Sequence, residues 1–377
     1  MIKQYPNEEL IYPLNIDPRK LNHQVILITG GTGSFGKQMT HTLLTNFKPK
    51  KIIIYSRDEY KQSLIKKDLT KEQMKLMRFF IGDVRDQERM ITAFHGVDIV
   101  FHASALKRIG ECEYNPMEAI KTNIIGTENV IQAAIKNQVK YVLGLSTDKA
   151  CNPVNLYGAT KLCGEKLLVN ANILGGGITK FCVIRYGNQL CSRGSIVEIF
   201  KNQKEQGRQL TVTDPTMTRF TILLQEAANF VLMCLDLMTG GEIFIPKLPS
   251  YSIEQMVKCF GQGKNYEVIG SRAGEKMHEL MISSDESHTA YEFEKFFILV
   301  TLEEYQLQMF DHDAYGRFEF KQREAQQAYS SGDNYLISNQ RLCQLIDEPY
   351  DSSYDNQDVL ENKKENSSKT INIKKEL

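Results

Sequence analysis

The sequence predicts an α/β protein built on a Rossmann-type, doubly wound parallel sheet, with a smaller mixed α/β domain after it. Two observations predict this. Short apolar runs alternate with stretches of helical pattern, and a glycine-rich loop follows the first run. The runs themselves do not alternate apolar with polar residues, which is typical of strands buried on both faces of a parallel sheet. With 377 residues, the chain has room for about two domains of roughly 150 residues each.

The elements of the first half follow in order. Strands are predicted at 25–29, 51–55, 78–81, 98–102, 141–146 and 181–186. Helices are predicted at 34–44, from Asn115-Pro116 onward, and at 155–170. Proline suits the first position of a helix because the N–H that it lacks has no helical partner there. Beyond residue 190, helices are expected near 195–207, 225–238 and 252–261, and strands near 209–213 and 242–246.

Four parts are expected along the chain. Residues 1–23 are polar, contain three prolines and are expected to form a loose arm. Residues 24–190 form the cofactor-binding domain, and residues 191–344 the substrate domain, with an approximate boundary that allows pieces to return to the first domain. Residues 345–377 are rich in Asn, Ser, Asp, Glu and Lys and are expected to be a disordered tail.

Composition excludes several function classes. The 46 Lys+Arg balance 46 Asp+Glu, which argues against binding of nucleic acid by the whole protein. No signal peptide and no apolar run of about 18 residues is present, so we expect a cytoplasmic protein with no membrane partner. The eight cysteines form no C-x-x-C pair and are expected to be reduced, mostly buried thiols. No metal site is predicted, because no zinc-type spacing occurs.

A glycine loop, Thr29-Gly-Gly-Thr-Gly-Ser-Phe-Gly36, joins the first strand to the first helix. Glycines there permit a tight turn and close approach of the backbone to a pyrophosphate, while the helix N-terminus offers free N–H groups. A Walker A loop overlaps this segment but is rejected, because Gln38 stands where Ser or Thr would hold magnesium. The residues predicted to bind a dinucleotide here are Gly30, Thr32, Gly33, Ser34, Phe35 and Gly36.

The tip of the second strand bears on the choice of dinucleotide. Ser56 and Arg57 suit a 2′-phosphate and favour NADP, whereas Asp58 keeps NAD as the alternative. Asp83, beside Val84 after the third strand, is placed to meet the adenine, although a turn or helix-capping aspartate is as good an interpretation.

Tyr157 and Lys161 are four residues apart near the start of a helix and therefore share a face. Lys161 is expected to lower the pKa of the Tyr157 phenol and to bind the nicotinamide ribose. Just upstream, Asp148 and Lys149 follow the fifth strand, at the sheet edge where ligands bind. They supply an acid and a base side by side, as removal of water from a sugar requires, although a solvated pair at a strand end is the plain alternative.

The glycine loop together with the Tyr157–Lys161 pair resembles the short-chain dehydrogenase/reductase superfamily, in its extended branch that modifies nucleotide sugars. Over residues 24–345 the sequence is similar to the inverting UDP-N-acetylglucosamine 4,6-dehydratases of the pseudaminic-acid and capsule type. The blocks that carry this similarity are SRDE (56–59), FFIGDVRD (79–86), HASALK (102–107), YNPMEAIKTNIIGT (114–127), LSTDKA (145–150), NLYGATKLC (155–163), RYGN (185–188), SRGS (192–195), MTRF (217–220), GEIFIPKLPS (241–250) and GEKMHE (274–279).

The resemblance implies a tightly bound, recycled NADP and a homo-oligomer. Tyr157, Lys161 and Thr147 would assist removal of a hydride from sugar carbon 4. Lys149 would then take the proton from carbon 5 while Asp148 protonates the departing 6-hydroxyl. A basic Lys149 must be neutral, so its pKa is expected to fall, with Lys107 or Lys161 as the neighbouring cation. The family pattern adds cofactor contacts at Ala103 and Lys107 and substrate contacts at Lys107, Asn188, Arg193, Arg219, Arg272 and Glu275.

Several positions depart from the family pattern without touching the catalytic group. They are Ser104, Arg108, Gly110, Gln189, Leu190, Cys191, Thr221 and Ala273, and they put the exact product in doubt rather than the reaction class. A retaining dehydratase or an epimerase acting on another UDP-sugar is the nearest alternative, although retaining dehydratases usually carry Asp-Glu where this chain has Asp148-Lys149. A cofactor-binding scaffold without turnover is the alternative of another class.

Overall fold

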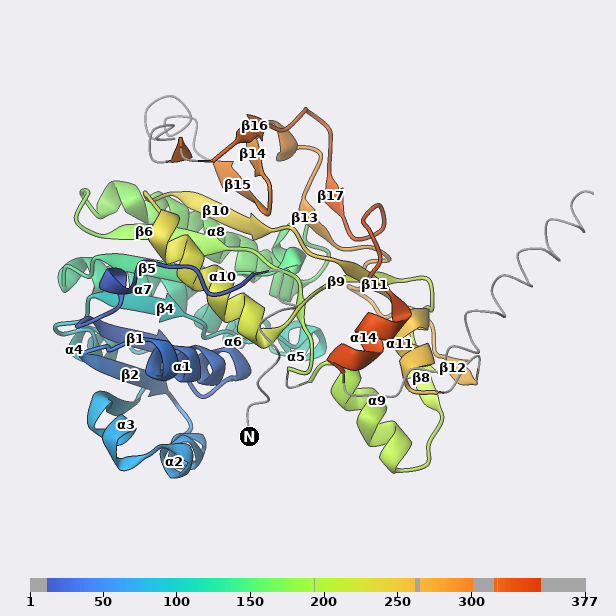
Figure 1. Ribbon diagram of the computed structural model, residues 1–377, viewed down its shortest axis with the longest axis horizontal. Coiled ribbons are helices and arrows are strands. Elements are labelled where there is room, and N and C mark those ends of the chain that lie inside the picture. Colours follow the sequence, from blue (N-terminus) through green and yellow to red (C-terminus); the bar gives the residue numbers. More distant parts are fainter. Residues whose placement is uncertain (1–11, 193, 262–264, 301–314, 317, 347–377) are drawn as a thin grey trace, which may run out of the picture.

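The computed structural model describes residues 12–192, 194–261, 265–300, 315–316 and 318–346. Its larger unit is centred on a ten-stranded sheet with the order β16-β14-β15-β10-β6-β5-β4-β1-β2-β3 (Figure 1). The first six strands are β1 (Val25–Thr29), β2 (Lys51–Ser56), β3 (Met77–Ile81), β4 (Ile99–His102), β5 (Tyr141–Leu145) and β6 (Lys180–Ile184). All six pair in parallel, so the predicted doubly wound fold is confirmed.

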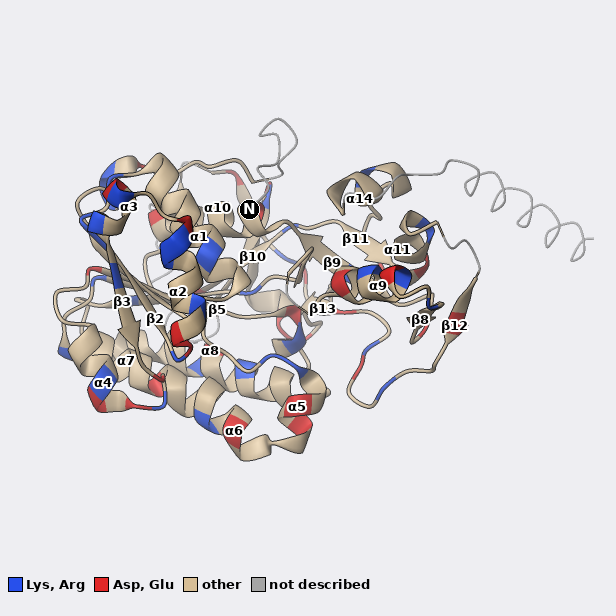
Figure 2. Cartoon of the chain, turned by 90° about the horizontal axis from the view of Figure 1, so that it is seen from below, with Lys and Arg blue, Asp and Glu red and all other residues tan. Residues whose placement is uncertain are grey.

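Helices cover both faces of this sheet, which is why its central strands are apolar throughout. Figure 2 shows α1 (Ser34–Asn46) and α10 (Leu224–Leu237) on one face and α4 (Gln87–Ala93), α7 (Gly126–Lys136) and α8 (Leu156–Leu174) on the other. The remaining helices of this half are α2 (Glu59–Asp68), α3 (Lys71–Leu76), α5 (Ile109–Tyr114) and α6 (Pro116–Ile120). A π-helical turn, η3 (Lys121–Ile125), joins α6 to α7, so the helix expected from Asn115-Pro116 is interrupted.

The second half of the chain contributes to two units. β10 (Glu242–Pro246) pairs in parallel with β6, and β15 (Phe296–Val300), β14 (Ala290–Phe293) and β16 (Phe320–Gln322) extend the same sheet in antiparallel fashion. The smaller unit has its own apolar core. It contains β7 (Asn188–Gln189), α9 (Ile196–Glu205), β8 (Leu210–Val212), β9 (Thr218–Ile222), β11 (Ser250–Ser252), α11 (Ile253–Cys259), β12 (Tyr266–Val268) and α14 (Asn339–Leu345). The predicted range 191–344 is thus interleaved between the two units.

A disulfide corrects the expectation that all cysteines are reduced. Cys259 at the end of α11 is bonded to Cys343 in α14, across 84 residues of sequence. Both cysteines are buried between the two helices, which pack side by side in the smaller unit. The other six form no disulfide: Cys112, Cys151, Cys182 and Cys234 are buried, whereas Cys163 and Cys191 are exposed.

The described part of the N-terminal arm is packed rather than loose. Tyr12 is buried against Phe230 of α10, with ring centroids 4.9 Å apart. Its hydroxyl donates to the backbone carbonyls of Lys247, at 3.0 Å, and Lys295. An aromatic side chain that fills a groove between a helix and the sheet offsets the loss of backbone freedom in the arm. Of the tail predicted at 345–377, residues 347–377 lie outside the described residues.

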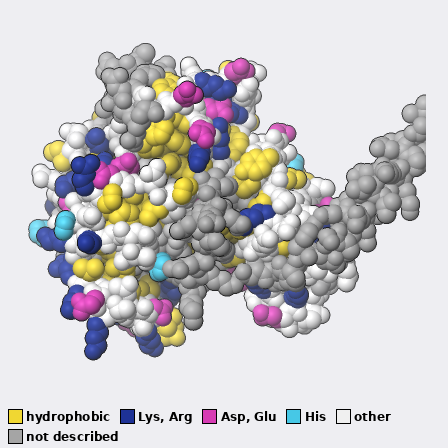
Figure 3. Space-filling model, viewed as in Figure 1, with side chains coloured by type: hydrophobic (Ala, Val, Ile, Leu, Met, Phe, Trp, Pro, Cys, Tyr) yellow, Lys and Arg dark blue, Asp and Glu magenta, His cyan; other side chains and the backbone are white. Residues whose placement is uncertain are grey.

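The surface in Figure 3 interleaves Lys and Arg with Asp and Glu, in keeping with the balanced charge of the chain. Among the described helices, none combines the length and the apolar character needed to cross a membrane. The described residues also contain no group of three or more His, Cys, Asp or Glu placed to hold a metal ion.

Candidate active site

The candidate site lies at the carboxyl edge of the parallel strands. β1 and β4 are neighbours there, at the point where the strand order reverses, and ligands of open α/β sheets bind at such a point. Three loops meet at this edge: the glycine loop after β1, residues 103–108 after β4, and residues 146–150 after β5. The sequence thus brings segments more than 100 residues apart to one place.

The glycine loop is shaped for close approach of a backbone-binding ligand. Gly30 has φ +64°, and a Cβ on it would lie 2.9 Å from the carbonyl oxygen of Ala103. A Cβ on Gly36 would lie 2.5 Å from the Cα of Gly31, so the first turn of α1 packs directly on the loop. Gly33 is the N-cap residue of α1 and provides no side-chain cap, which leaves the first N–H groups of the helix for a phosphate.

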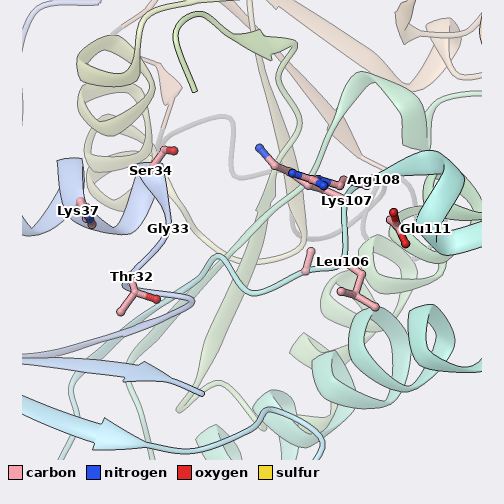
Figure 4. Close-up of a pocket in the computed structure, with 9 residues that line it drawn as sticks. Thr32, Gly33, Ser34, Lys37, Leu106, Lys107, Arg108 and Glu111 are labelled. Atoms are coloured by element: carbon pink, nitrogen blue, oxygen red, sulfur yellow. The ribbon is translucent and has the colours of Figure 1, made fainter. Parts of the chain in front are cut away.

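A pocket of about 330 Å³ opens between this loop and the segment after β4. Figure 4 shows the glycine loop and the start of α1 facing residues 105–111. Its lining residues are Thr32, Gly33, Ser34, Lys37, Ala105, Leu106, Lys107, Arg108 and Glu111. Three cations, Lys37, Lys107 and Arg108, suit a diphosphate, and the glycine cradle has room for one, so the residues fit a dinucleotide. Lys37, Arg108 and Glu111 were not predicted, because they lie outside the glycine pattern and outside the family blocks that predict Ala103 and Lys107.

Replacing Gly36 by alanine is expected to abolish retention of a dinucleotide, because the new methyl group would collide with backbone rather than with a movable side chain. The measurement is the amount of nucleotide released on denaturing equal amounts of purified protein. Gly110→Ala is the matched control, since a Cβ there meets nothing within 4 Å. Equal nucleotide in Gly36→Ala and the parent would contradict the placement of the phosphates.

The predicted residues at the tips of β2 and β3 are partly committed to each other. Asp58 caps α2 through the backbone N–H of Lys61, at 2.9 Å, and also pairs with the Lys61 amine. The Arg57 side chain is 55% exposed and lies 3.6 Å from Asp83. Asp83 accepts the backbone N–H of Arg85 at 3.0 Å, which is the turn geometry considered as its alternative. Burial raises the pKa of Asp83, but Arg85 and Arg57 outweigh it and hold that pKa below its ordinary value.

Two further residues predicted to bind the cofactor are core residues. Phe35 and Val84 are both buried in the main apolar cluster. Ser56 is buried as well, and its hydroxyl accepts a hydrogen bond from Gln62 at 3.0 Å. Backbone contacts at these positions stay predictions.

An asparagine in the π-helical turn ties the segment after β4 to the catalytic helix. Asn123 bonds both the backbone N–H and the carbonyl of Leu106, at 2.8 and 2.9 Å. The same amide donates to the hydroxyl of Thr160 in α8, also at 2.9 Å. The backbone directly before Lys107 is therefore held in place.

The structure brings the predicted acid, base and tyrosine together. Asp148 and Lys149 open a short 3₁₀ turn, η4 (Asp148–Ala150), capped by Thr147. The Lys149 amine donates to Asp148 Oδ1 at 3.1 Å, and the Thr147 hydroxyl donates to the same oxygen at 2.9 Å. The Thr147 hydroxyl also lies close to the buried phenol of Tyr157. The five groups predicted to be catalytic thus lie on η4 and the facing start of α8.

The charge state of Lys149 differs from the expectation. Burial acts to lower its pKa, but the carboxylates of Asp148 and Glu279 outweigh burial, so the pKa lies above its ordinary value instead of several units below. The nearby cation that lowers it is Arg219, not Lys107 or Lys161. Burial and Glu279 raise the pKa of Asp148 above its ordinary value, although Lys149 and Thr147 act to lower it. The proton of the Asp148–Lys149 pair therefore lies on the Lys149 amine. The Asp148 carboxylate, with its raised pKa, can accept that proton.

The electrostatics of Tyr157 also differ from the expectation. Burial raises its pKa to about 12, against opposing effects of the Lys149 charge and the neighbouring Thr147 hydroxyl. Lys161, predicted to be the cation that lowers it, instead donates to the carbonyl of Leu145 at 2.7 Å. Burial lowers the pKa of Lys161 to about 8, against an opposing effect of Glu165.

A buried ion network supports the floor of the site. Arg185 is fully buried and bonds Glu165 at 2.7 and 3.0 Å and Glu286 at 3.0 Å. Glu165 also accepts from Ser146, beside Thr147, and Glu286 accepts from the thiol of Cys151, just after η4. The network therefore fixes both ends of the segment that carries Asp148 and Lys149.

The smaller unit supplies the opposite wall. Asn188 accepts from the Lys149 amine at 3.2 Å, and Arg219 of β9 lies near the same amine. Glu275 is partly buried and Arg272 exposed, on the segment that precedes β13 (Leu280–Ile282). This segment is held to the site by Lys276, which donates to the carbonyl of Cys151 at 2.6 Å. Arg193 lies outside the described residues.

A further residue of the site, Glu279, was also not predicted. Glu279 lies 3.2 Å from the Lys149 amine and is buried directly before β13. It ends the GEKMHE block, and its signal in the sequence is a charged residue immediately before a short apolar run.

Two of the positions that depart from the family pattern, Gln189 and Thr221, lie near this wall. Gln189 donates to the hydroxyl of Tyr186 at 2.8 Å, and Thr221 pairs with Asn188 between β7 and β9. Ala273 is exposed.

A Rossmann-type sheet with a tyrosine, a lysine and a threonine at its carboxyl edge defines an enzyme of the extended short-chain dehydrogenase/reductase class. Residues 26–301 match the family described as "Polysaccharide biosynthesis protein", and the chain belongs to this family. It is 55% identical over 280 residues to UDP-N-acetylglucosamine 4,6-dehydratase (inverting) of Campylobacter jejuni, covering 74% of this chain and 83% of that one. It is 44% identical over 271 residues to UDP-glucose 4-epimerase of Rickettsia rickettsii, covering 70% and 79%.

Solved structures agree. Pen from Bacillus thuringiensis superposes with a TM-score of 0.78 at 36% identity, covering 86% of this chain and 97% of that one. The dTDP-glucose 4,6-dehydratase DesIV from Streptomyces venezuelae shares the fold, with a TM-score of 0.61 at 18% identity, covering 67% and 86%. The resemblance to inverting dehydratases expected from the motifs is thus confirmed.

Proposed function

We propose that this chain is an NADP-dependent UDP-N-acetylglucosamine 4,6-dehydratase that inverts carbon 5 of the sugar. The observation that carries the proposal is the buried Asp148–Lys149 pair beside Thr147 and Tyr157 at the carboxyl edge of β5. An acid and a base at one point serve an elimination, which neither a reductase nor a plain epimerase requires. The product would be UDP-2-acetamido-2,6-dideoxy-β-L-arabino-hexos-4-ulose. The choice of UDP-N-acetylglucosamine as substrate is supported by the Campylobacter jejuni relative, which is named for that substrate.

The side chains divide the reaction between them. Tyr157 takes the proton of the 4-hydroxyl, and the positive charge of Lys149 favours its phenolate by lowering the phenol's pKa. A bound nicotinamide would accept the hydride from carbon 4 and return it to carbon 6. The ketone at carbon 4 acidifies the proton on carbon 5, which Lys149 removes. Asp148 protonates the departing 6-hydroxyl, and its raised pKa suits that task. Once carbon 6 has regained a hydride, carbon 5 takes up a proton of solvent origin on the opposite face, which inverts its configuration.

The remaining residues would hold the ligands. Lys161 would bind the nicotinamide ribose, and Lys107, between the two ligand sites, would contact both. The UDP group would lie against the smaller unit, where the Arg219 guanidinium suits a phosphate and Glu275 a ribose hydroxyl. Glu275 keeps one buried carboxylate oxygen without a hydrogen bond among the described residues, as a residue awaiting a ligand hydroxyl would. Asn188, Arg193 and Arg272 complete the proposed set.

The choice of NADP is supported by the tip of β2. Asp58, which would accept a ribose hydroxyl of NAD, already caps α2 and pairs with Lys61. The half-exposed Arg57 guanidinium, 3.6 Å from Asp83, would meet a 2′-phosphate. Mass spectrometry of the nucleotide released from the purified protein distinguishes the two cofactors.

The test of the function is incubation of the protein with UDP-N-acetylglucosamine in deuterated water, without added cofactor, followed by NMR. We expect a 4-keto-6-deoxy sugar with deuterium and inverted configuration at carbon 5. Retained configuration would keep the dehydratase but remove the role of Lys149. Interconversion of 4-epimers alone would point to an epimerase. Unchanged substrate, even with NADP and other UDP-sugars added, would favour a cofactor-binding scaffold.

Two further expectations belong to this proposal. We expect a homo-oligomer, which sedimentation of the purified protein would reveal. We also expect a cytoplasmic location, which cell fractionation would test.

A further inference from the structure

Glu279 reaches the base from a backbone that is fixed on both sides. Its N–H donates to the hydroxyl of Ser331 and its carbonyl accepts the N–H of Ser331, each at 2.9 Å. Two residues earlier, the carbonyl of Met277 accepts the N–H of Thr218 at 3.0 Å. The Glu279 side chain is 4% exposed, so its carboxylate has little freedom to leave the site.

The Lys149 amine is surrounded by three acceptors. They are Asp148 Oδ1 at 3.1 Å, Asn188 Oδ1 at 3.2 Å and Glu279 Oε1 at 3.2 Å. An ammonium group has three N–H donors, so each donor has one acceptor. Both carboxylates keep a second oxygen, Asp148 Oδ2 and Glu279 Oε2, that is buried without a hydrogen bond among the described residues. Such atoms are rare in folded proteins and call for an explanation.

We propose that Glu279 is a positioning residue for the elimination step: its carboxylate holds the Lys149 amine against Asp148, so that one proton can pass between these two side chains. The inference rests on the proposed function, in which Lys149 is the base and Asp148 the acid. Asn188 provides a neutral third point of attachment. Glu279 itself touches neither the reacting carbons nor the leaving oxygen in this scheme.

The proton transfer makes both working groups at once. One N–H bond of Lys149 breaks, its electron pair stays on Nζ, and an O–H bond forms on Asp148 Oδ1, 3.1 Å away. The pair passes from an ammonium and a carboxylate to a neutral amine and a carboxylic acid, with no change in total charge. Glu279 and Arg219 keep their opposite charges 3.9 Å apart throughout. The neutral amine can then accept the proton of carbon 5, and the acid can protonate the 6-hydroxyl.

The charges around Lys149 predict the direction in which its pKa changes when Glu279 is replaced. Asp148 and Glu279 raise its pKa, and Arg219 lowers it. Tyr157 of α8 and Tyr251 of β11 also sense the charge of Lys149, and Lys276 lies near Glu279. Removing the charge of Glu279 destabilises the ammonium, so Lys149 should lose its proton at lower pH. The part of the pH profile of kcat that falls at high pH should move the same way, because a pair that has lost its proton to solvent has no acid to protonate the 6-hydroxyl.

The experiment compares Glu279→Gln and Glu279→Ala in the full-length protein. Glutamine keeps an acceptor oxygen of the same reach but no charge, whereas alanine removes both. The pKa of Lys149 is read from the ¹³Cε signal of labelled lysine, assigned by its loss in Lys149→Met. Rates are measured across pH with UDP-N-acetylglucosamine. Glu267→Gln, on exposed β12, is the matched control.

We expect both variants to lower the pKa of Lys149 by about 1 to 3 pH units. In Glu279→Ala, kcat should also fall about 10²-fold, as misplacement of a reacting group by about 1 Å can cause, while KM stays near that of the parent. Glu279→Gln should recover much of that loss. An unshifted ¹³Cε titration, or a full kcat in Glu279→Ala, would overturn the inference. If the parent protein dehydrates no UDP-sugar while the titration still shifts, the proposed function fails but the anchoring of Lys149 by Glu279 stands.

Discussion

Replacing Lys149 by methionine is expected to reduce kcat for dehydration by about 10²–10⁴-fold, the usual contribution of a general base. Methionine has a similar length and apolar stem but no amine, so proton removal from carbon 5 loses its acceptor. The measurement is the rate of 4-keto-6-deoxy sugar formation at saturating substrate. Substrate binding, measured by calorimetry, should change much less, because Lys149 acts on the sugar and not on the diphosphate.

A matched control separates this effect from any change in overall charge. Lys166→Met removes one exposed lysine from α8, the helix that carries Tyr157, and should leave kcat unchanged. Incorporation of solvent deuterium at carbon 5 should be lost in Lys149→Met together with dehydration. Undiminished turnover in Lys149→Met would falsify the role of this residue as the base.

Replacing Arg185 by leucine is expected to lower the free energy of unfolding by about 3–5 kcal/mol, the range found when one partner of a buried ion pair is removed. The Arg185 side chain is fully buried and holds two carboxylates, Glu165 and Glu286. Leucine would leave the buried Glu165 and the partly buried Glu286 without their cation. Urea unfolding of the parent and the variant at pH 7 measures the difference.

The pH dependence of this difference has a definite sign. Burial raises the pKa of Glu286, but Arg185 outweighs burial and lowers that pKa from 4.5 to about 2. A carboxyl with a depressed pKa in the folded state stabilises it fully above the unfolded pKa, and this stabilisation is lost as pH falls toward the folded value. The gap between parent and variant should therefore narrow as pH is lowered from 4.5 toward 2. Lys75→Met, which breaks an exposed pair with Glu72, should cost only about 0–1 kcal/mol. A loss as small as this in Arg185→Leu would contradict the prediction.

The strands and the glycine loop could be predicted from the sequence because their signals are local. Each buried strand is an apolar run a few residues long, so β1 and β10 begin and end where the pattern places them. The disulfide between Cys259 and Cys343 has no such signal, since only the packing of α11 on α14 brings two residues 84 positions apart into contact.

For the site, too, features that depend on neighbouring residues could be predicted, whereas features that depend on distant residues could not. Asp148 and Lys149 are adjacent, so their pairing was expected from the sequence. The charge on Lys149 was not, because it depends on Glu279, which reaches the amine from a segment 130 positions further along the chain. Likewise, the opposing electrostatics of Tyr157 and Lys161 follow from burial depth, which the spacing of two residues on a helix does not reveal.

The hydrogen bonds of Asn123 restrict the relative motion of two elements that line the site. By joining Leu106 to Thr160, this amide makes the loop after β4 and the catalytic helix one rigid body. Separating these two elements to admit a sugar nucleotide would break the bonds of Asn123. The spacing between the segment that carries Lys107 and the helix that carries Tyr157 would therefore be set before either ligand arrives.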